Sequence, residues 1–300
     1  MTARALNTSG FTLIELLVSL SLAGILLTTM YSIFKTSING VGTVRDQNQL
    51  IFDVRTAGNF VADTLNAAVY IYPPKIQLSL TTIDPTNQYA TQHLGTSRSW
   101  TVQTDPFIAG LLPPNDRTVT CNTTTPYSST SPTAASQAGC YRIAAFYSVA
   151  RSAYVAAAPT LANPGNDATI PSNAQLLMYY WAYVNPDNNS TVPWPTSGFQ
   201  GRATLLADYL TSGGMVFEDS ATWKCTDPTT GGIGTTGGSF TNCSDITSPV
   251  ISGTNAQRLV SATQLSVTLQ TGTMRNGQLR TISGLRFWIG PRNVGLGAKQ

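Results

Sequence analysis

A long apolar run near the start of the chain constrains its fold more than any other feature. From Phe11 to Phe34 the sequence reads FTLIELLVSLSLAGILLTTMYSIF, and Glu15 is its only charged residue. A helix needs about 20 predominantly apolar residues to cross the hydrocarbon core of a bilayer. The apolar region of a secretory signal peptide spans only about 7 to 15 residues, and this run continues well past the small residues Ala23-Gly24. The sequence therefore predicts a membrane-spanning helix.

Glu15 lies inside this apolar run and needs a cationic partner. An unpaired carboxylate at the centre of a membrane helix costs about 2.5 to 3.5 kcal/mol, and it marks a functional site by default. The nearest cations in the sequence, Arg4 and Lys35, are more than two helical turns away. Cleavage after Gly10 would give Phe11 a free α-amino group one turn from Glu15, and the amine of a neighbouring subunit would serve equally well. A plain membrane anchor explains the length of the run but not Glu15.

The residues around the start of the run form a recognisable pattern. Ser9-Gly10 precedes Phe11, and Glu15 is the fifth residue of the apolar stretch FTLIELLV. This pattern closely resembles the class III signal of type IV pilins and type II secretion pseudopilins. The resemblance implies cleavage after Gly10 by a membrane-embedded prepilin peptidase, N-methylation of Phe11 and assembly into a filament. It also implies an assembly salt bridge between Glu15 and the N-terminal amine of a neighbouring subunit.

The helix that begins in the apolar run is expected to continue beyond it. No proline occurs between Phe11 and Tyr72. Apolar residues then recur at the three- and four-residue steps of an amphipathic helix, at Leu50, Val54, Ala57, Val61, Leu65 and Ala68. One helix from Phe11 to about Ala68 is predicted, with Gly58 among its weak points. The predicted organisation is a leader, a transmembrane or filament-core helix, an amphipathic continuation and an extracytoplasmic head, at residues 1–10, 11–34, 35–69 and 70–300.

The first part of the predicted head carries few regular signals. Tyr72-Pro73-Pro74 ends the helix, and Thr81–Asp116 contains scattered turn residues. Strand-like runs follow at Tyr141–Val149 and Leu176–Val184, whereas Arg202–Leu210 fits either a strand or a short helix.

The clearest strand signal lies near the end of the chain. Leu265, Val267 and Leu269 alternate with polar residues, and Asn276-Gly277 is typical of a hairpin turn. Leu279–Ile289 is expected to return as the partner strand or strands. A long helix followed by mainly antiparallel strands predicts an α+β layered arrangement, and the fold implied by the resemblance to pilins agrees with it.

Four cysteines suit an oxidising compartment and permit three disulfide connectivities. We favour Cys121 with Cys140 and Cys225 with Cys243, because each bridge would close a loop rich in Ser, Thr and Gly. Each would stabilise the fold by roughly 3 kcal/mol on the chain-entropy estimate. A zinc site is the alternative, but it lacks a closely spaced pair of cysteines and a partner histidine.

Composition excludes several classes of function. Charged residues make up 10% of the chain and the net charge is +3, so a basic nucleic-acid-binding domain is not expected. His93 is the single histidine, in a polar stretch that predicts an exposed side chain. No catalytic triad, metal cluster or cofactor motif can be assembled, so an enzyme is not expected. Gly231–Gly238 lacks the lysine of a phosphate loop, and Asn185–Ser190 is interpreted as a turn rather than a calcium loop.

Two further stretches indicate which kind of pilin-like protein this is. Asp53-Val-Arg-Thr-Ala-Gly58 and Phe287-Trp-Ile-Gly-Pro-Arg-Asn293 resemble segments of PilW-type minor pilins, and the J-type minor pseudopilins of type II secretion share the same plan. Major pilins usually carry a proline in the hydrophobic segment, and this chain has none there.

The expected function is therefore that of a structural subunit, a minor pilin that helps to initiate pilus assembly. Its implied partners are prepilin peptidase, other minor and major pilins or pseudopilins, the inner-membrane assembly platform and the membrane. It would span the inner (cytoplasmic) membrane once and then enter a pilus or pseudopilus at the cell surface or in the periplasm. A minor pseudopilin and a filament-displayed adhesive module are the alternatives.

Overall fold

The computed structural model describes residues 12–72, 77–82, 85–93, 97–121, 137–157, 163–167, 170–184, 199–219, 223–226, 233–234, 260–262, 265–275 and 278–291. Gly10, Phe11, Cys243, Asn276-Gly277 and Asn185–Ser190 lie outside these residues, as does most of Gly231–Gly238. Two compact units are present, residues 1–50 and residues 51–300, and each is described by itself.

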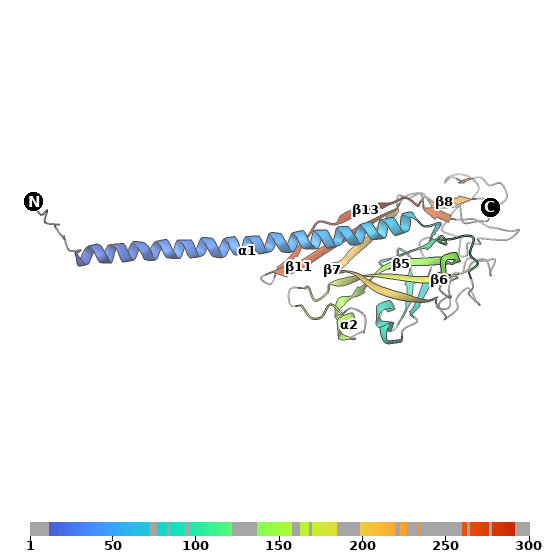
Figure 1. Ribbon diagram of the computed structural model, residues 1–300, viewed down its shortest axis with the longest axis horizontal. Coiled ribbons are helices and arrows are strands. Elements are labelled where there is room, and N and C mark those ends of the chain that lie inside the picture. The colour runs from blue at the N-terminus through green and yellow to red at the C-terminus, as the bar shows by residue number, and fades with distance from the viewer. Residues whose placement is uncertain are drawn as a thin grey trace, which may run out of the picture. The chain divides into compact units, whose positions relative to one another are not determined.

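The predicted N-terminal helix is present as one uninterrupted element. Helix α1 spans Leu13–Asn66 (Figure 1), close to the expected limits. Among the residues that the structure describes, α1 is the one helix that is long and apolar enough to cross a membrane. In its first half, the hydroxyls of Ser19, Ser21, Thr28 and Thr29 donate to backbone carbonyls of the preceding turn. These polar side chains are thereby satisfied within the helix, as a hydrocarbon environment requires.

The last turns of α1 and the residues directly after it belong to the head and pack against its sheet. Val54, Ala57, Val61, Leu65 and Ala68 are all buried, as the predicted apolar stripe requires. They share one hydrophobic cluster with sheet residues that include Phe146, Leu177, Val267 and Ile289. Burial of the valine and leucine side chains among them stabilises the packed state by about 1.5 to 3 kcal/mol each.

The head is built on a ten-stranded sheet. Its main path runs β1-β4-β5-β6-β7-β11-β12, and all neighbours along this path are antiparallel. These strands are β1 (Tyr70–Ile71), β4 (Phe107–Leu112), β5 (Tyr141–Ala150), β6 (Gln175–Val184), β7 (Phe199–Asp219), β11 (Leu265–Arg275) and β12 (Gln278–Thr281). Strand β13 (Leu285–Ile289) also pairs with β11. The α+β class with a mainly antiparallel sheet is confirmed.

A second hydrophobic cluster, separate from the one that contains the α1 residues, draws on the remaining elements of the head. These are β2 (Gln77–Thr82) and β3 (Ser99–Thr101), which complete the ten-stranded sheet, the 3-10 helix η1 (Pro85–Thr91) and the short helix α2 (Arg151–Ala156). Strand β2 pairs with β3 and runs parallel to the start of β7. Trp100 and Tyr147 are buried here, and their polar atoms donate to the carbonyls of Thr91 and Ala90 at 2.9 and 2.7 Å. Two aromatic side chains thus fasten η1 to the sheet.

Four further short elements complete the described part of the head. The 3-10 helix η2 spans Gln137–Gly139. Strand β8 (Trp223–Thr226) pairs with β9 (Ile233–Gly234) on one side and β10 (Val260–Ala262) on the other. Glycine is required in η2, because a Cβ at Gly139 would collide with the carbonyl of Val119.

The strand predictions are confirmed near the C-terminus and incomplete before it. Strands β5, β6 and β11 match their predicted positions, and β12 returns along β11 in a hairpin register. The ambiguous run Arg202–Leu210 is strand, within β7. The stretch Thr81–Asp116 contains β4, a strand that its scattered turn residues did not predict. All six residues of β4 are buried, so the strand lacks the alternation that marks a half-exposed strand.

The prediction that His93 is exposed is wrong. Its backbone N–H donates to the carbonyl of Ser97, which turns the loop back on itself. The His93 ring lies 4.5 Å from that of Trp100, and Nε2 is 3.2 Å from Oδ1 of Asp105. Its side chain is only 20% exposed. The indole of Trp100 in β3 and the carboxylate of Asp105 in the following turn therefore shield the imidazole of His93.

One of the two favoured disulfides is seen in the structure. Cys121 and Cys140 are bonded, as their spacing suggested. Cys225 lies in β8, and its proposed partner Cys243 is outside the described residues, so that second bridge stays a prediction.

Candidate functional site

Glu15 occupies the first turn of α1, where its carboxylate folds back onto the chain that enters the helix. Oε2 of Glu15 accepts hydrogen bonds from the backbone N–H of Thr12 at 3.0 Å and from its hydroxyl at 2.8 Å. The carbonyl of Thr12 in turn accepts from the backbone N–H of Glu15 at 3.0 Å. Among the described residues, Oε1 of Glu15 has no hydrogen-bond partner. The carboxylate is therefore held at the N-terminal end of α1 through Oε2, and no residue that the structure describes bonds to its other oxygen.

The two hydrogen bonds from Thr12 supply part of the stabilisation that a carboxylate in an apolar run needs. Thr12 and Glu15 have the spacing of a capping box, in which an acidic side chain at the third helical position returns to the N-cap backbone N–H. The signal Thr-x-x-Glu is readable in the sequence, although the expectation of a cationic partner for Glu15 did not include it. Negative charge is also favoured near a helix N-terminus. Thr12 thus fixes the direction of the carboxylate without neutralising it.

The two weaker sequence motifs come together in the head. Gly58 on α1 lies against the ring of Phe287 on β13, in contact with its Cε2 and Cζ atoms. Further along, Oδ1 of Asn66 in the last turn of α1 accepts a hydrogen bond from the backbone N–H of Gly290 at 2.7 Å. The segments that begin at Asp53 and at Phe287 therefore form one helix-to-sheet junction.

Comparison with known proteins identifies the N-terminal segment. Residues 6–31 match the family described as the prokaryotic N-terminal methylation motif. The segment carries a prepilin-type N-terminal methylation motif. This match supports a type IV pilin or pseudopilin, a type of structural protein rather than an enzyme. It also fits an anchor in the membrane followed by assembly with other pilins. Comparison with curated proteins and with solved structures gives no match.

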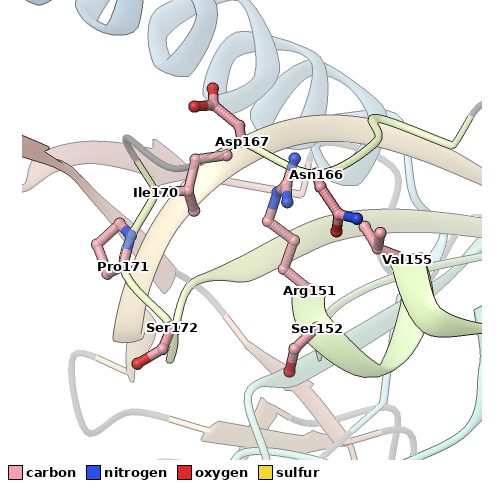
Figure 2. A pocket seen from close by; sticks show the side chains of 8 residues that line it. All are labelled: Arg151, Ser152, Val155, Asn166, Asp167, Ile170, Pro171 and Ser172. Carbon is pink, nitrogen blue, oxygen red and sulfur yellow. The ribbon is translucent and has the colours of Figure 1, made fainter.

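Beyond the prepilin-type leader, the head contains a cavity that the sequence did not indicate. The cavity is about 470 Å³ in volume and lies between α2 and the residues that follow it (Figure 2). Its walls are formed by Arg151, Ser152, Val155, Asn166, Asp167, Ile170, Pro171 and Ser172. In Figure 2 the Arg151 side chain extends from the start of α2 toward Asn166 and Asp167.

Arg151, which lines this cavity, belongs to a buried ion pair. Nε of Arg151 is 3.0 Å from both carboxylate oxygens of Asp208 on β7, and the two side chains are 8% and 13% exposed. Oδ1 of Asp208 also accepts from the backbone N–H of Tyr209 at 2.6 Å. A charged pair removed from water needs such additional hydrogen bonds to offset its desolvation.

Tyr209 adopts a backbone conformation that is rare for a bulky residue. Its φ is 66°, in the left-handed region, where the register between β6 and β7 shifts. Its hydroxyl donates to Oδ2 of Asp167 at 3.4 Å. Burial, and then the nearby carboxylates of Asp167 and Asp208, raise the pKa of Tyr209. Tyr209 thus bonds to both carboxylates, to Asp208 through its backbone N–H and to Asp167 through its hydroxyl. Residues with strained backbones of this kind cluster at functional sites.

Proposed function

We propose that the protein is a minor pilin that helps to initiate assembly of a type IV pilus. The match of residues 6–31 to the methylation motif carries this proposal. Its support includes the 54-residue unbroken helix α1 and the lack of proline in residues 11–34. The large head, with a disulfide, suits a subunit exposed outside the cytoplasm. Its position would be the inner membrane first and the filament afterwards.

Processing would occur at the junction of leader and helix. We infer that prepilin peptidase cleaves between Gly10 and Phe11 and that Phe11 is then N-methylated. The new terminus would stand one residue before Thr12, which already holds Oε2 of Glu15. Oε1, to which no described residue bonds, would then accept from the N-terminal amine of a neighbouring subunit. In this mechanism Thr12 positions the carboxylate, and Glu15 supplies the charge that selects a correctly docked subunit.

Intact-mass and N-terminal analysis of the protein purified from membranes tests the processing step. We expect a chain that begins at methylated Phe11. A chain that still begins at Met1, or one cut near Gly24, would overturn the proposal.

A strain that lacks this protein tests the assembly role. We expect few surface pili and reduced twitching, with full recovery when the wild-type chain is supplied. Unchanged piliation together with failed release of secreted proteins would instead support a minor pseudopilin of type II secretion.

A further inference from the structure

Strand β6 carries a row of aromatic side chains on the sheet face that α1 packs against. Tyr179, Trp181 and Tyr183 alternate along the strand with residues of the opposite face. Tyr180, one of those residues, is fully buried, whereas the three rings of the row are partly exposed. Phe60 of α1 packs edge-on against Tyr179, with ring centres 5.1 Å apart. Among the ring contacts of the described residues, α1 reaches Tyr179 and neither Trp181 nor Tyr183.

Two arginines on the neighbouring strands lie beside this row. Arg142 of β5 is directly opposite Tyr183 in the register, and Arg202 of β7 is directly opposite Trp181. Directly opposite residues share one face of a sheet. The guanidinium carbon of Arg202 lies 5.8 Å from the centre of the Trp181 ring, within the range of a cation–π interaction. The rings of Trp181 and Tyr183 are 5.3 Å apart. These two arginines and two rings form one surface, which we call the arginine–aromatic face.

The strands that form this face do not neutralise its positive charge. Strands β5 and β6 and residues 201–207 of β7, all of which the structure describes, contain no Asp or Glu. No described residue forms an ion pair with Arg142 or Arg202, and Arg202 is exposed. The small net charge of the chain gives no sign of this, because the two arginines come together only in the sheet. The face therefore complements a ligand that carries negative charge.

A ligand that uses the whole face needs both anionic groups and flat groups that stack. Single-stranded nucleic acid has both, since its phosphates follow cationic side chains and its bases stack on aromatic rings. Bases also stack on the planes of arginine guanidinium groups. We propose that the arginine–aromatic face binds single-stranded nucleic acid. Successive bases would stack on Tyr183 and on the Arg202–Trp181 pair, with the adjoining phosphates at the guanidinium groups of Arg142 and Arg202.

Two other anionic partners fit the face less well. A nucleic-acid duplex presents phosphates but keeps its bases stacked on one another, so Trp181 and Tyr183 would contribute little to binding. An acidic polysaccharide lying across both rings would need them coplanar, and the planes of Trp181 and Tyr183 are inclined by 83°. With only two arginines, binding should be modest and sensitive to salt. The inference does not depend on the role in pilus assembly.

Fluorescence anisotropy with the full-length protein in neutral detergent micelles tests the proposal. The labelled probe is a thymidylate strand of about 12 nucleotides. The competitors are an abasic deoxyribose-phosphate strand and a duplex, both of the same length, and hyaluronate. We expect the abasic strand and the duplex to bind about tenfold more weakly than the thymidylate strand or worse, because they offer no base to the rings. Equal binding of the abasic strand or of the duplex, or tighter binding of hyaluronate, would overturn the proposal.

Variants of the face separate binding from folding. Arg202→Gln should weaken binding of the thymidylate strand about fivefold, with an unchanged melting temperature. The slope of log affinity against log salt should become shallower by about 0.7, the contribution of one phosphate contact on a single strand. Arg280→Gln makes the same change of charge on the exposed strand β12. It is the matched control and should bind like the wild type.

A second variant tests the stacking interaction alone. Tyr183→Leu keeps an apolar side chain and both arginines, so it should weaken binding of the thymidylate strand about fivefold and leave binding of the abasic strand unchanged. If neither Arg202→Gln nor Tyr183→Leu changes binding, or if Arg280→Gln weakens it equally, the strand is held elsewhere and the assignment is wrong.

Discussion

Gly58 of α1 and Phe287 of β13 are in direct contact, and the absence of a side chain at Gly58 makes room for the aromatic ring. A glycine inside a helix costs roughly 1 kcal/mol relative to alanine, so its presence there needs a reason. The ring of Phe287 supplies that reason, because a Cβ at this position would overlap Cε2 and Cζ. The junction sets how closely the end of α1 approaches the sheet.

Gly58→Ala is expected to lower the free energy of unfolding of the head by about 1 to 2 kcal/mol, because overpacking outweighs the better helix propensity of alanine. In a Phe287→Ala background the same substitution should be neutral or stabilising by up to about 1 kcal/mol. Chemical denaturation of the four proteins of this double-mutant cycle gives the coupling energy. Additive effects of the two substitutions would show that the contact does not restrain the helix.

This junction also shows how far the sequence could lead. The helix stripe and the alternation at Leu265, Val267 and Leu269 predicted elements correctly because each pattern has a period that one face of the element imposes. The contact between Gly58 and Phe287 depends on a crossing of elements that are far apart in the chain, and no local pattern encodes it. Strand β4 was missed because burial on both faces removes the alternation.

The candidate sites divide in the same way. Glu15 was found from sequence because a charge is conspicuous in an apolar run, whereas its partner Thr12 was overlooked as an ordinary polar residue. The cavity at Arg151 could not be anticipated, since Asp208 and Asn166 reach it from β7 and from the segment after α2. Its residues carry no shared spacing that a sequence search would detect.

The disulfide is expected to contribute measurably to the stability of the head. Replacement of both Cys121 and Cys140 by serine should lower the free energy of unfolding by about 2 to 4 kcal/mol, because the unfolded chain regains the entropy of an open loop. Thermal unfolding of the oxidised wild type and of the double variant measures the difference. The single variant Cys121→Ser serves as a control for unwanted pairing of Cys140. Equal melting temperatures for wild type and double variant would contradict the expectation.

The buried tyrosines predict a loss of stability at alkaline pH. Burial raises the pKa of Tyr147 well above its ordinary value, with a smaller contribution from Tyr180, and burial also raises the pKa of Tyr180 itself. A raised pKa in the folded state means that the stabilisation is complete below the pKa of the unfolded chain, about 10, and is lost as the pH rises through the folded value. The head is therefore expected to unfold more readily above about pH 10.

Absorbance of tyrosinate and far-ultraviolet circular dichroism, recorded in one alkaline titration, measure this effect. The buried tyrosines Tyr147 and Tyr180 should ionise only when the head unfolds. Tyr147→Phe removes the hydrogen bond to the carbonyl of Ala90 and should cost about 1 kcal/mol at neutral pH, while the decline in stability with pH becomes less steep. Ionisation of all tyrosines in the folded protein would show that the burial argument is wrong.

The last prediction concerns the two residues at the start of α1. Glu15→Gln removes the charge, and Thr12→Val removes the hydroxyl donor to Oε2 but keeps the backbone N–H donor. If Glu15 selects the N-terminal amine of a neighbouring subunit, Glu15→Gln should be cleaved and methylated normally and yet be nearly absent from sheared filaments. Thr12→Val should enter filaments at a reduced level, since the carboxylate keeps its charge and loses one of its two restraints.

Ser19→Ala, which removes a hydroxyl that only bonds within the helix, is the control and should assemble like the wild type. Quantitative mass spectrometry of membrane and filament fractions separates processing from assembly, and normal incorporation of Glu15→Gln would show that the charge has no part in docking.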